Sequence, residues 1–353
     1  MTSDSKSPDT QAGVSRRDLV QSLAIGAAAA GMTAPVLAQT SGVVAEATAA
    51  DYTRDPTGWG SAEVASLFPG FRHLDMRTDG AIIRVRHGGS GPPLMMLHGY
   101  PNSHVSWYRI AARLAQNYHV VLADLRGYGD SSLPDPGPNN VNYSFRVMAE
   151  DMISIMEQLG YRQFYLVGHD RGARLSHRMC LDHPERVIKL ALLDMLPTYY
   201  VLTHTTKDWA VGTWHWGFLA QPEPFPETLL SAVPAEWFLR SRGGGGLATQ
   251  SKPVFDEFVR VWTPKTIKGA CRDYRANVTI DFAMDAADQG RKISNPLLIL
   301  WGTRGQPPTD EYPTVWRQYA SNIVAMEPFN SGHYLHWDVA DQVYDRFAKF
   351  FTA

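Results

Sequence analysis

Residues 164–181 limit what this chain can fold into more than any other stretch of its sequence. The apolar run Phe164–Val167 predicts a buried strand and Arg171–Leu181 predicts a helix, so only a tight turn can join them. Glycines at positions 168 and 172 allow one backbone segment to pass close to another in that turn. Asp170 stands at the tip of the turn, between the expected strand and the expected helix.

This strand–turn–helix pattern is that of a nucleophile elbow, and Asp170 occupies the position of the serine in the motif G-x-S-x-G. A carboxylate nucleophile attacks carbon directly and forms an ester with the enzyme. A serine-type esterase is excluded at this turn because Asp170 has no hydroxyl group. The alternative to a nucleophile is that this aspartate, at the start of a helix, is a solvated residue or a helix cap.

Two arginines follow the turn. Arg171 and Arg174 are three residues apart, so on a helix they share one face beside Asp170. Paired guanidinium groups near a nucleophile favour a substrate that carries its own carboxylate. The competing interpretation of Arg174 is a surface ion pair, and Arg178, one turn further along, is interpreted as structural.

The rest of the chain alternates strands with helices, which predicts an α/β fold with a doubly wound, mostly parallel sheet. The expected strands are an opening hairpin, Phe71–Arg77 and Ala81–His87, followed by Leu94–Leu97, His119–Ala123, Phe164–Val167, Val187–Leu193, Leu297–Leu300 and Ile323–Met326. The expected helices are Trp107–Gln116, Ser144–Leu159, Arg171–Leu181, Pro313–Tyr319 and Ala340–Phe351.

The pattern changes between Pro197 and Ser294, where aromatic residues and prolines are frequent and no buried strand is apparent. This segment is expected to be an α-helical cap inserted over the carboxyl edge of the sheet. The predicted organisation is therefore a first core segment (66–196), a helical cap (197–294) and a second core segment (295–353). The run Gly243–Gly246 in the cap predicts a mobile piece that gates entry.

The N-terminal residues resemble an export signal rather than part of the fold. Ser15–Val20 matches a twin-arginine motif, an alanine-rich run follows, and Val36–Ala38 offers a cleavage site of small residues. Residues 1–38 are thus expected to be a signal peptide, residues 39–65 a linker, and the mature enzyme periplasmic or secreted. The alanine-rich run is too weakly apolar for a spanning helix.

The composition narrows the choice of partners. The 353 residues are 44% hydrophobic and 19% charged, with a net charge of −2, as in an ordinary soluble globular protein. No basic surface for nucleic acid or for an anionic membrane is expected.

The two cysteines, Cys180 and Cys271, form no metal motif, and whether they pair is left open. Three histidines are expected to be structural rather than metal ligands: His98, His169 and His177.

Several motifs together resemble one family, the fluoroacetate (haloacetate) dehalogenases of the α/β-hydrolase superfamily. The matching pieces are HGYPNSHVSW (98–107), ADLRGYGDS (123–131), GHDRGARLSHRM (168–179), LLDMLPTYY (192–200), WHWGF (214–218), DYRANVTIDF (273–282) and SGH (331–333). The first two mark only the superfamily, whereas GHDRGxR combined with WHW is more specific. The resemblance implies the α/β-hydrolase fold, no metal or organic cofactor, and a homodimer.

The resemblance also implies a catalytic triad. Asp170 would be the nucleophile, His333 the base, and Asp194, which follows the strand Val187–Leu193, the acid that orients the histidine. Many α/β-hydrolases place this acid after the next core strand, but that position holds Gly305 here. Asp310 is the rival candidate for the acid.

The resemblance to the dehalogenases also assigns further site residues, by their positions in the matching motifs. The backbone N–H groups of Tyr100 and Arg171 would hold the oxyanion of the ester intermediate. The side chains of Arg171 and Arg174 would bind the substrate carboxylate, and three cap donors would bind the halide: His215, Trp216 and Tyr274. Each of these cap residues would by itself more often be a packed aromatic, but all three carry the N–H or O–H donors that a departing fluoride needs.

The expected reaction is hydrolytic dehalogenation of a short 2-haloacid, such as fluoroacetate or chloroacetate, to glycolate and halide through an aspartyl ester. The first alternative is an epoxide hydrolase with the same nucleophile, whose two cap tyrosines would come from Tyr199, Tyr200 and Tyr274. Such enzymes, like haloalkane dehalogenases of neutral substrates, usually carry tryptophan where Arg171 stands here. A non-catalytic carboxylate-binding protein is the second alternative, which the intact set Asp170, Asp194 and His333 disfavours.

Overall fold

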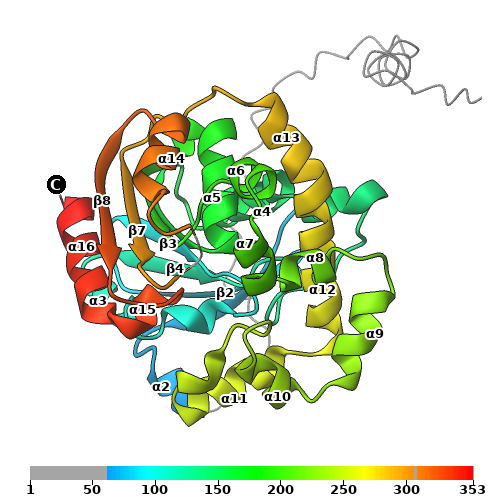
Figure 1. Ribbon diagram of the computed structural model, residues 1–353. Helices are drawn as coiled ribbons and strands as arrows, with labels where there is room; N and C mark the ends of the chain where they lie inside the picture. The colour runs from blue at the N-terminus through cyan, green and yellow to red at the C-terminus, as the bar shows by residue number, and fades with distance from the viewer. Residues whose placement is uncertain (1–61, 306–307, 353) are drawn as a thin grey trace, which may run out of the picture. The chain divides into compact units, whose positions relative to one another are not determined.

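The computed structural model describes residues 62–305 and 308–352, and its centre is an eight-stranded sheet in the order β1-β2-β4-β3-β5-β6-β7-β8 (Figure 1). β1 and β2 form an antiparallel hairpin, β2 pairs antiparallel with β4, and the pairs from β4 to β8 are parallel. The strands are Arg72–Arg77 (β1), Ile82–Gly88 (β2), Pro93–Leu97 (β3), His119–Ala123 (β4), Phe164–His169 (β5), Val187–Leu193 (β6), Leu297–Gly302 (β7) and Ile323–Phe329 (β8). The predicted doubly wound sheet is confirmed.

Helices cover both faces of this sheet. α4 (Phe145–Gln158) and α5 (Arg171–Asp182) pack together on one face, and α3 (Ala111–Leu114) and α16 (Ala340–Thr352) lie on the other (Figure 1). α14 is Tyr312–Tyr319, between β7 and β8. Central strands are buried on both sides, which explains their continuous apolar sequences.

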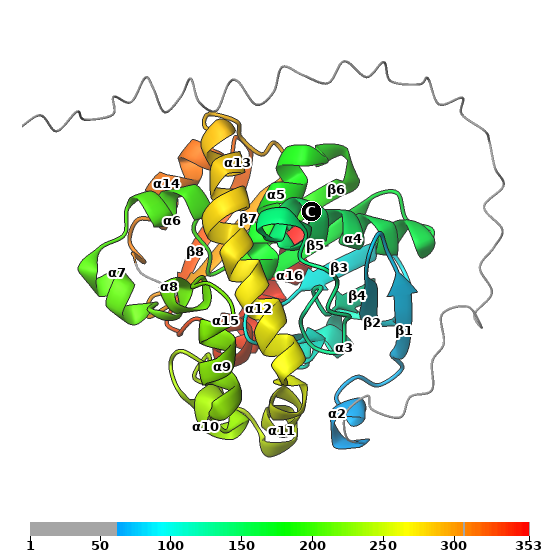
Figure 2. The same cartoon turned by 90° about the vertical axis from the view of Figure 1, so that its right-hand side faces the viewer.

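The cap follows β6 and ends before β7. Its helices are α6 (Thr198–Thr203), α7 (Lys207–Gly212), α8 (His215–Leu219), α9 (Phe225–Ala232), α10 (Ala235–Arg240), η6 (Leu247–Thr249), α11 (Lys252–Val261), α12 (Pro264–Ala276), the π-helix η7 (Asn277–Asp281) and α13 (Phe282–Ala287). Figure 2 shows α12, η7 and α13 following one another as one long helix. No strand interrupts this segment in the described part of the chain.

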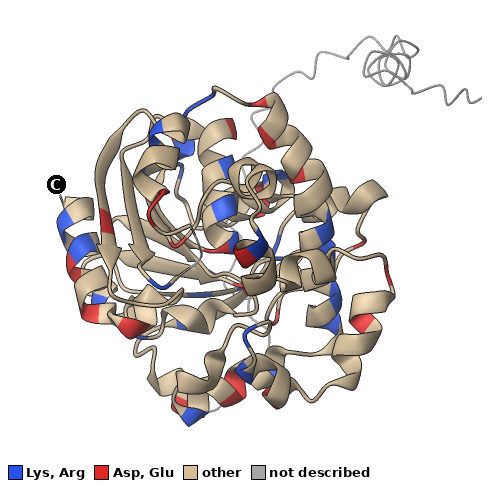
Figure 3. Ribbon diagram, in the orientation of Figure 1, with Lys and Arg blue, Asp and Glu red and all other residues tan. Residues whose placement is uncertain are grey.

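The long cap helix is fixed to the core by close packing and by charge. A Cβ atom on Gly269 of α12 would overlap the backbone of Gly127, so the two segments touch without side chains. Arg178 of α5 pairs with Asp288 at 2.7 Å, just after α13, which agrees with a structural role. Acidic and basic residues are mixed along the described helices (Figure 3).

Some details differ from the sequence-based expectation. The helix expected over Trp107–Gln116 is reduced to a 3₁₀ turn, His104–Trp107, and α3. The last residues of the expected linker belong to a helix, α2 (Ala62–Ser66), in which Val64 is buried. The proposed signal peptide and the rest of the linker lie outside the described residues. Cys180 and Cys271 are both buried free thiols.

Three of the four glycines Gly243–Gly246 pack closely against other segments, whereas a Cβ atom on Gly246 would meet nothing within 4 Å. A Cβ atom on Gly243 would overlap the ring of Trp214, and one on Gly245 would lie 2.7 Å from the Tyr334 hydroxyl.

No described helix is long and apolar enough to cross a membrane.

Candidate active site

The turn between β5 and α5 holds Asp170 in an unusual backbone conformation, with φ 51° and ψ −112°. Such a conformation is strained for a residue with a side chain and persists only where the surroundings enforce it. Two glycines make the turn possible. A Cβ atom on Gly168 would lie 2.6 Å from the Cα of Ala173, and one on Gly172 would lie 2.6 Å from the carbonyl oxygen of His98. The sequence therefore forms the predicted elbow.

The loop after β3 receives the Asp170 carboxylate. The backbone N–H of Tyr100 donates to Asp170 Oδ1 at 2.9 Å. A side chain at position 99 would overlap the carboxylate, so Gly99 leaves the space that Asp170 occupies. The Arg171 backbone N–H is the first of α5, directly after the nucleophile position. An oxygen at Oδ1 thus already has one fixed amide donor.

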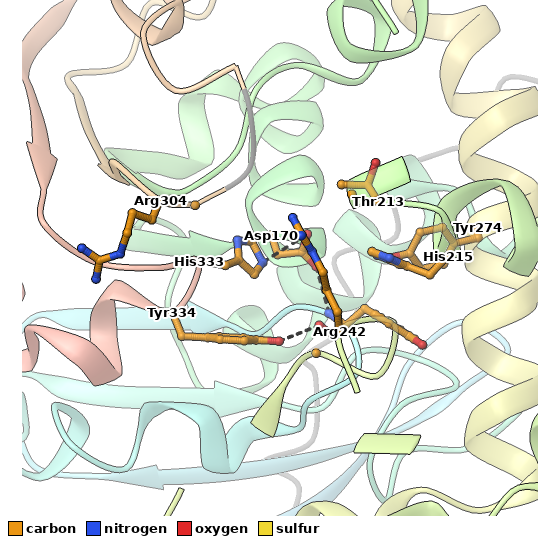
Figure 4. A pocket seen from close by; sticks show the side chains of 12 residues that line it. Asp170, Thr213, His215, Arg242, Tyr274, Arg304, His333 and Tyr334 are labelled. Atoms are coloured by element: carbon orange, nitrogen blue, oxygen red, sulfur yellow. Dashed lines mark hydrogen bonds and ion pairs between the residues drawn. The ribbon is translucent and has the colours of Figure 1, made fainter. Parts of the chain in front are cut away.

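His333 lies in the loop between β8 and α15 (Leu335–Asp338), and both of its ring nitrogens face carboxylates. Its Nδ1 lies 2.5 Å from Asp194 Oδ2, and its Nε2 lies 3.8 Å from Asp170 Oδ2. Asp194 follows β6, and its Oδ1 accepts the backbone N–H of Gly302 at 2.9 Å. The structure therefore brings the three expected triad residues together from the ends of three different parallel segments (Figure 4 shows two of them).

Position 305, after β7, cannot hold the acid that many α/β-hydrolases carry there. A side chain at position 305 would overlap the carboxylate of Asp194. Asp310, the rival acid, is exposed, whereas Asp194 is fully buried and contacts His333. His169 adds a second support, because its Nε2 lies 2.9 Å from the backbone carbonyl oxygen of His333.

The charges around the triad favour an ionised nucleophile and a charged base. Burial tends to raise the pKa of Asp170, but nearby positive charges, including His333 and Arg171, outweigh it and lower that pKa to about 2. Burial tends to lower the pKa of His333. The hydrogen bond to Asp194 and the charges of both aspartates outweigh burial, so the pKa of His333 is raised above its ordinary value.

Arg171 has a partner that the sequence analysis did not identify. Its Nε donates to Asp273 Oδ2 at 2.9 Å and its Nη2 pairs with Asp273 Oδ1. Both side chains are completely buried, and Tyr128 donates to the same carboxylate at 2.6 Å. The remaining nitrogen, Nη1, has no hydrogen-bond partner among the described residues. A buried guanidinium requires a counter-charge, but nothing in the sequence singles out Asp273 among the available carboxylates.

Arg174 is buried as well, and it is not the surface ion pair considered as the alternative. Its Nη1 donates to the carbonyl oxygen of Leu196 and to Thr198 Oγ1, at 2.9 and 3.0 Å. Its Nε and Nη2 have no partner among the described residues. Burial, together with the charge of Arg171, lowers the pKa of Arg174 to about 10, which leaves the guanidinium charged at neutral pH.

The three expected halide donors form one aromatic group with Tyr100. The ring of Tyr274 lies 5.7 Å from Trp216, 6.0 Å from His215 and 5.3 Å from Tyr100, measured between centroids. The indole N–H of Trp216 has no hydrogen-bond partner among the described residues. Burial lowers the pKa of His215 to about 4 and raises that of Tyr274 well above its ordinary value. Both side chains are therefore neutral and carry their protons.

These residues border a cavity of about 290 Å³ (Figure 4). Its wall consists of Tyr100, Asp170, Gly212, Thr213, His215, Arg242, Gly245, Tyr274, Arg304, Gly305, His333 and Tyr334. Trp216, Arg171 and Arg174 are buried and are not part of this wall. The sequence analysis did not single out Thr213, Arg242, Arg304 or Tyr334, because nothing in their local sequence marks them.

Known proteins with similar sequences support the same architecture. The family model described as alpha/beta hydrolase fold matches residues 92–340. A fluoroacetate dehalogenase from Burkholderia sp. is 42% identical over 262 residues, which cover 73% of this chain and 86% of the relative.

Two further proteins show how broad the similarity is. A soluble epoxide hydrolase from Corynebacterium sp. is 29% identical over 270 residues, which cover 75% of this chain and 91% of the relative. A solved structure from Nostoc sp. PCC 7120, provisionally described as an α/β hydrolase, superposes with a TM-score of 0.76 at 42% identity. That superposition covers 80% of this chain and 98% of the Nostoc chain.

Proposed function

The chain belongs to the α/β-hydrolase fold family, in the branch that contains fluoroacetate dehalogenases, and we propose that it hydrolyses short 2-haloacids such as fluoroacetate and chloroacetate. The observation that carries the proposal is the placement of one carboxylate. Asp170 Oδ1 accepts the Tyr100 amide at 2.9 Å, while Oδ2 lies 3.8 Å from His333 Nε2. A carboxylate held in this way can attack carbon and then be regenerated by water.

In the first step, Asp170 Oδ2 attacks the α-carbon of the haloacid in line with the carbon–halogen bond. A C–O bond forms, the halide leaves with the bonding electrons, and an aspartyl ester remains. Because the pKa of Asp170 is lowered to about 2, the attacking carboxylate is ionised at neutral pH. Its Oδ1 keeps the hydrogen bond from Tyr100 and becomes the carbonyl oxygen of the ester.

In the second step, His333 Nε2 takes a proton from water, and the resulting hydroxide attacks the carbonyl carbon of Asp170. The Tyr100 N–H, which already donates to Oδ1, holds the negative charge there, and we assign the second donor to the Arg171 N–H. The carbonyl carbon–alkoxide bond then breaks, and His333 returns the proton to the hydroxy acid. Asp194 stabilises the imidazolium through its contact with Nδ1 at 2.5 Å.

The donors around the nucleophile suit both ends of the substrate. Trp216 Nε1, Arg171 Nη1 and two nitrogens of Arg174 are buried without partners among the described residues. Buried donors without partners favour anions that can accept from them. We assign the halide to the neutral donors His215, Trp216 and Tyr274, and the substrate carboxylate to Arg171 and Arg174.

An epoxide hydrolase is disfavoured by the cap tyrosines. Such an enzyme needs two tyrosines that protonate the epoxide oxygen, yet of the three candidates only Tyr274 borders the cavity. Tyr199 stacks on Phe282, and Tyr200 bonds to Glu311. A carboxylate-binding protein without activity is disfavoured because such a protein does not need a base, His333, beside Asp170.

The test is halide release from chloroacetate and fluoroacetate by purified protein that lacks residues 1–38. Release is expected from the wild type and is expected to be lost in Asp170→Asn. In His333→Gln, one halide per enzyme molecule should be released, with a gain in protein mass of one carboxymethyl group, the ester of Asp170 with glycolate. Release from neither acid, with both proteins folded, would contradict the proposal.

A single turnover in H₂¹⁸O separates this mechanism from direct attack by water. The label is expected in Asp170 and not in the glycolate of the first turnover, because water attacks the ester carbonyl. Label in the first glycolate would show that water attacks the substrate instead.

We also propose that the enzyme is exported by the twin-arginine route, on the strength of Ser15–Val20 and the site of small residues at 36–38. Cell fractionation should find the activity outside the cytoplasm, with residues 1–38 removed. Substitution of both Arg16 and Arg17 by Lys should retain the full-length chain in the cytoplasm.

A further inference from the structure

The cavity wall contains two arginines that the proposed reaction does not use, Arg242 and Arg304. Arg242 follows α10, is exposed to solvent, and lines the same cavity as Asp170 and His333. Arg171 and Arg174, in contrast, are buried and are not part of the wall. An anion that enters from solvent therefore meets Arg242 before it meets either buried arginine.

Arg242 also lacks the acidic partner that its neighbours have. In the cap, Arg240 pairs with Glu236 at 3.0 Å, and Arg275 pairs with Glu227 at 2.6 Å. Arg260 pairs with Asp130, also at 2.6 Å. Among the described residues, no carboxylate lies within ion-pair distance of Arg242. Its charge is thus available to a ligand.

The surrounding backbone fixes where this guanidinium sits. Gly243 and Gly244 come directly after it, and side chains on them would overlap Trp214 and Phe238. Opposite, at the end of α7, a Cβ atom on Gly212 would lie 3.0 Å from Arg242 Nη2. Two segments of the cap that are far apart in sequence therefore leave a space that the Arg242 side chain enters.

The direction of the side chain agrees with this placement. Figure 4 shows Arg242 extending into the cavity, whereas the guanidinium of Arg304 points away from Asp170. Arg304 bonds to Asn330 instead. The charge of Arg242 also reaches the halide donor His215, whose pKa is lowered chiefly by burial and further by Arg242.

A carboxylate-bearing substrate needs such a group. The nucleophile Asp170 is itself an anion, so it repels the acid that it must attack. A cationic side chain at the mouth of a cleft raises the local concentration of an anionic substrate and its rate of entry. The cavity has the space for an intermediate position, since its volume is about 290 Å³ and fluoroacetate has only five heavy atoms.

We propose that Arg242 is a binding residue that receives the substrate carboxylate at the mouth of the cavity before the acid reaches Arg171 and Arg174. This inference rests on the proposed function, because it takes the substrate to be a haloacid anion. Arg242 would govern capture of the acid, and the chemical steps would remain with Asp170 and His333.

The first test is the kinetics of chloroacetate turnover by Arg242→Gln, with Arg240→Gln as the matched control on the neighbouring, already paired arginine. At low ionic strength, kcat/KM of Arg242→Gln is expected to fall about tenfold with kcat changed less than about twofold. The difference should shrink at high salt, where the charge is screened. Arg242→Lys should recover part of the loss, and Arg240→Gln should behave as the wild type.

The second test does not depend on turnover. Calorimetry would measure chloroacetate binding to Asp170→Asn and to the double variant Asp170→Asn/Arg242→Gln, with about tenfold weaker binding expected in the latter. Unchanged affinity and unchanged kcat/KM would overturn the role of Arg242 while leaving the proposed function intact. Binding that depends on Arg242 in a protein without halide release would instead overturn the proposed function alone. No binding of chloroacetate to Asp170→Asn would overturn both.

Discussion

Gly305 leaves free the space that the carboxylate of Asp194 occupies, because a Cβ atom at position 305 would overlap both carboxylate oxygens. The acid that orients His333 and the glycine that admits it come from the ends of neighbouring strands, β6 and β7. In this chain, the position after β7 therefore serves the triad through the absence of a side chain.

Gly305→Ala is expected to displace Asp194 from His333 and to lower kcat for chloroacetate by about tenfold or more, since a misoriented histidine is a poor base. Steady-state halide release would measure the effect. Gly217→Ala is the control, because nothing lies within 4 Å of a Cβ atom there. Wild-type kcat in Gly305→Ala would show that the carboxylate does not need this space.

The pH profile should report the titration of His333. In the free enzyme, where Asp170 is ionised, the pKa of His333 is raised above its ordinary value, so NMR titration of the His333 ring should give a midpoint above 6.5. Because only the neutral imidazole accepts a proton, kcat should rise with pH as His333 loses its proton. In Asp194→Asn, the midpoint for His333 should move down, which NMR titration of the His333 ring can follow even if activity is low. An unchanged midpoint would mean that Asp194 does not stabilise the imidazolium.

The buried pair of Arg171 and Asp273 should matter for stability. Asp273→Asn leaves a buried guanidinium without its counter-charge and is expected to lower the free energy of unfolding by about 3 kcal/mol. Urea denaturation would measure the loss. Asp256→Asn, which breaks the exposed pair with Lys252, should cost less than about 1 kcal/mol. Equal effects of the two substitutions would contradict the importance of burial.

Asp281 should make stability fall as pH rises. It is fully buried in the π-helix, its Oδ1 accepts the backbone N–H of Phe145 at 2.9 Å, and burial raises its pKa to about 8. Between about pH 4 and pH 8 the folded state therefore holds a proton that the unfolded state releases, which destabilises the fold progressively until the penalty is complete above pH 8.

Asp281→Asn removes that penalty while keeping an acceptor for Phe145. Its Tm is expected to exceed that of the wild type by several degrees near pH 8 and by much less near pH 4, for a free-energy difference of a few kcal/mol. Thermal unfolding at both pH values would show this. A Tm difference that does not grow with pH would contradict the raised pKa.

The elements that position the triad could be predicted because each has a local signal. The elbow needs Gly168 and Gly172, and its strand is an uninterrupted apolar run. The choice of Asp194 over Asp310 rested on resemblance alone. The structure shows why that choice is physically sound, since Gly305 and the Gly302 amide provide for the carboxylate of Asp194.

The contacts between cap and core could not be predicted, because they join residues that are far apart in the chain. Arg171 and Asp273 are 102 positions apart, and the sequence offers many carboxylates as partners for a buried arginine. Arg242 was missed for a related reason: an exposed arginine in a cap turn resembles any surface arginine until the cavity it borders is known. The four glycines beside it were interpreted as mobile, and the close packing of three of them against other segments could not be seen in the sequence either.

The insertion of the cap between β6 and β7 places the triad and the proposed halide donors in different segments of the chain. Asp170, Asp194 and His333 all belong to the core, whereas His215, Trp216 and Tyr274 belong to the inserted segment. Under the proposed assignment of the halide to cap residues, we expect a chimera with the cap of a related hydrolase to keep Asp170 and His333 and to change its leaving-group and substrate preference. The graft must carry an acid at the position of Asp273, or Arg171 would have to be replaced together with the cap.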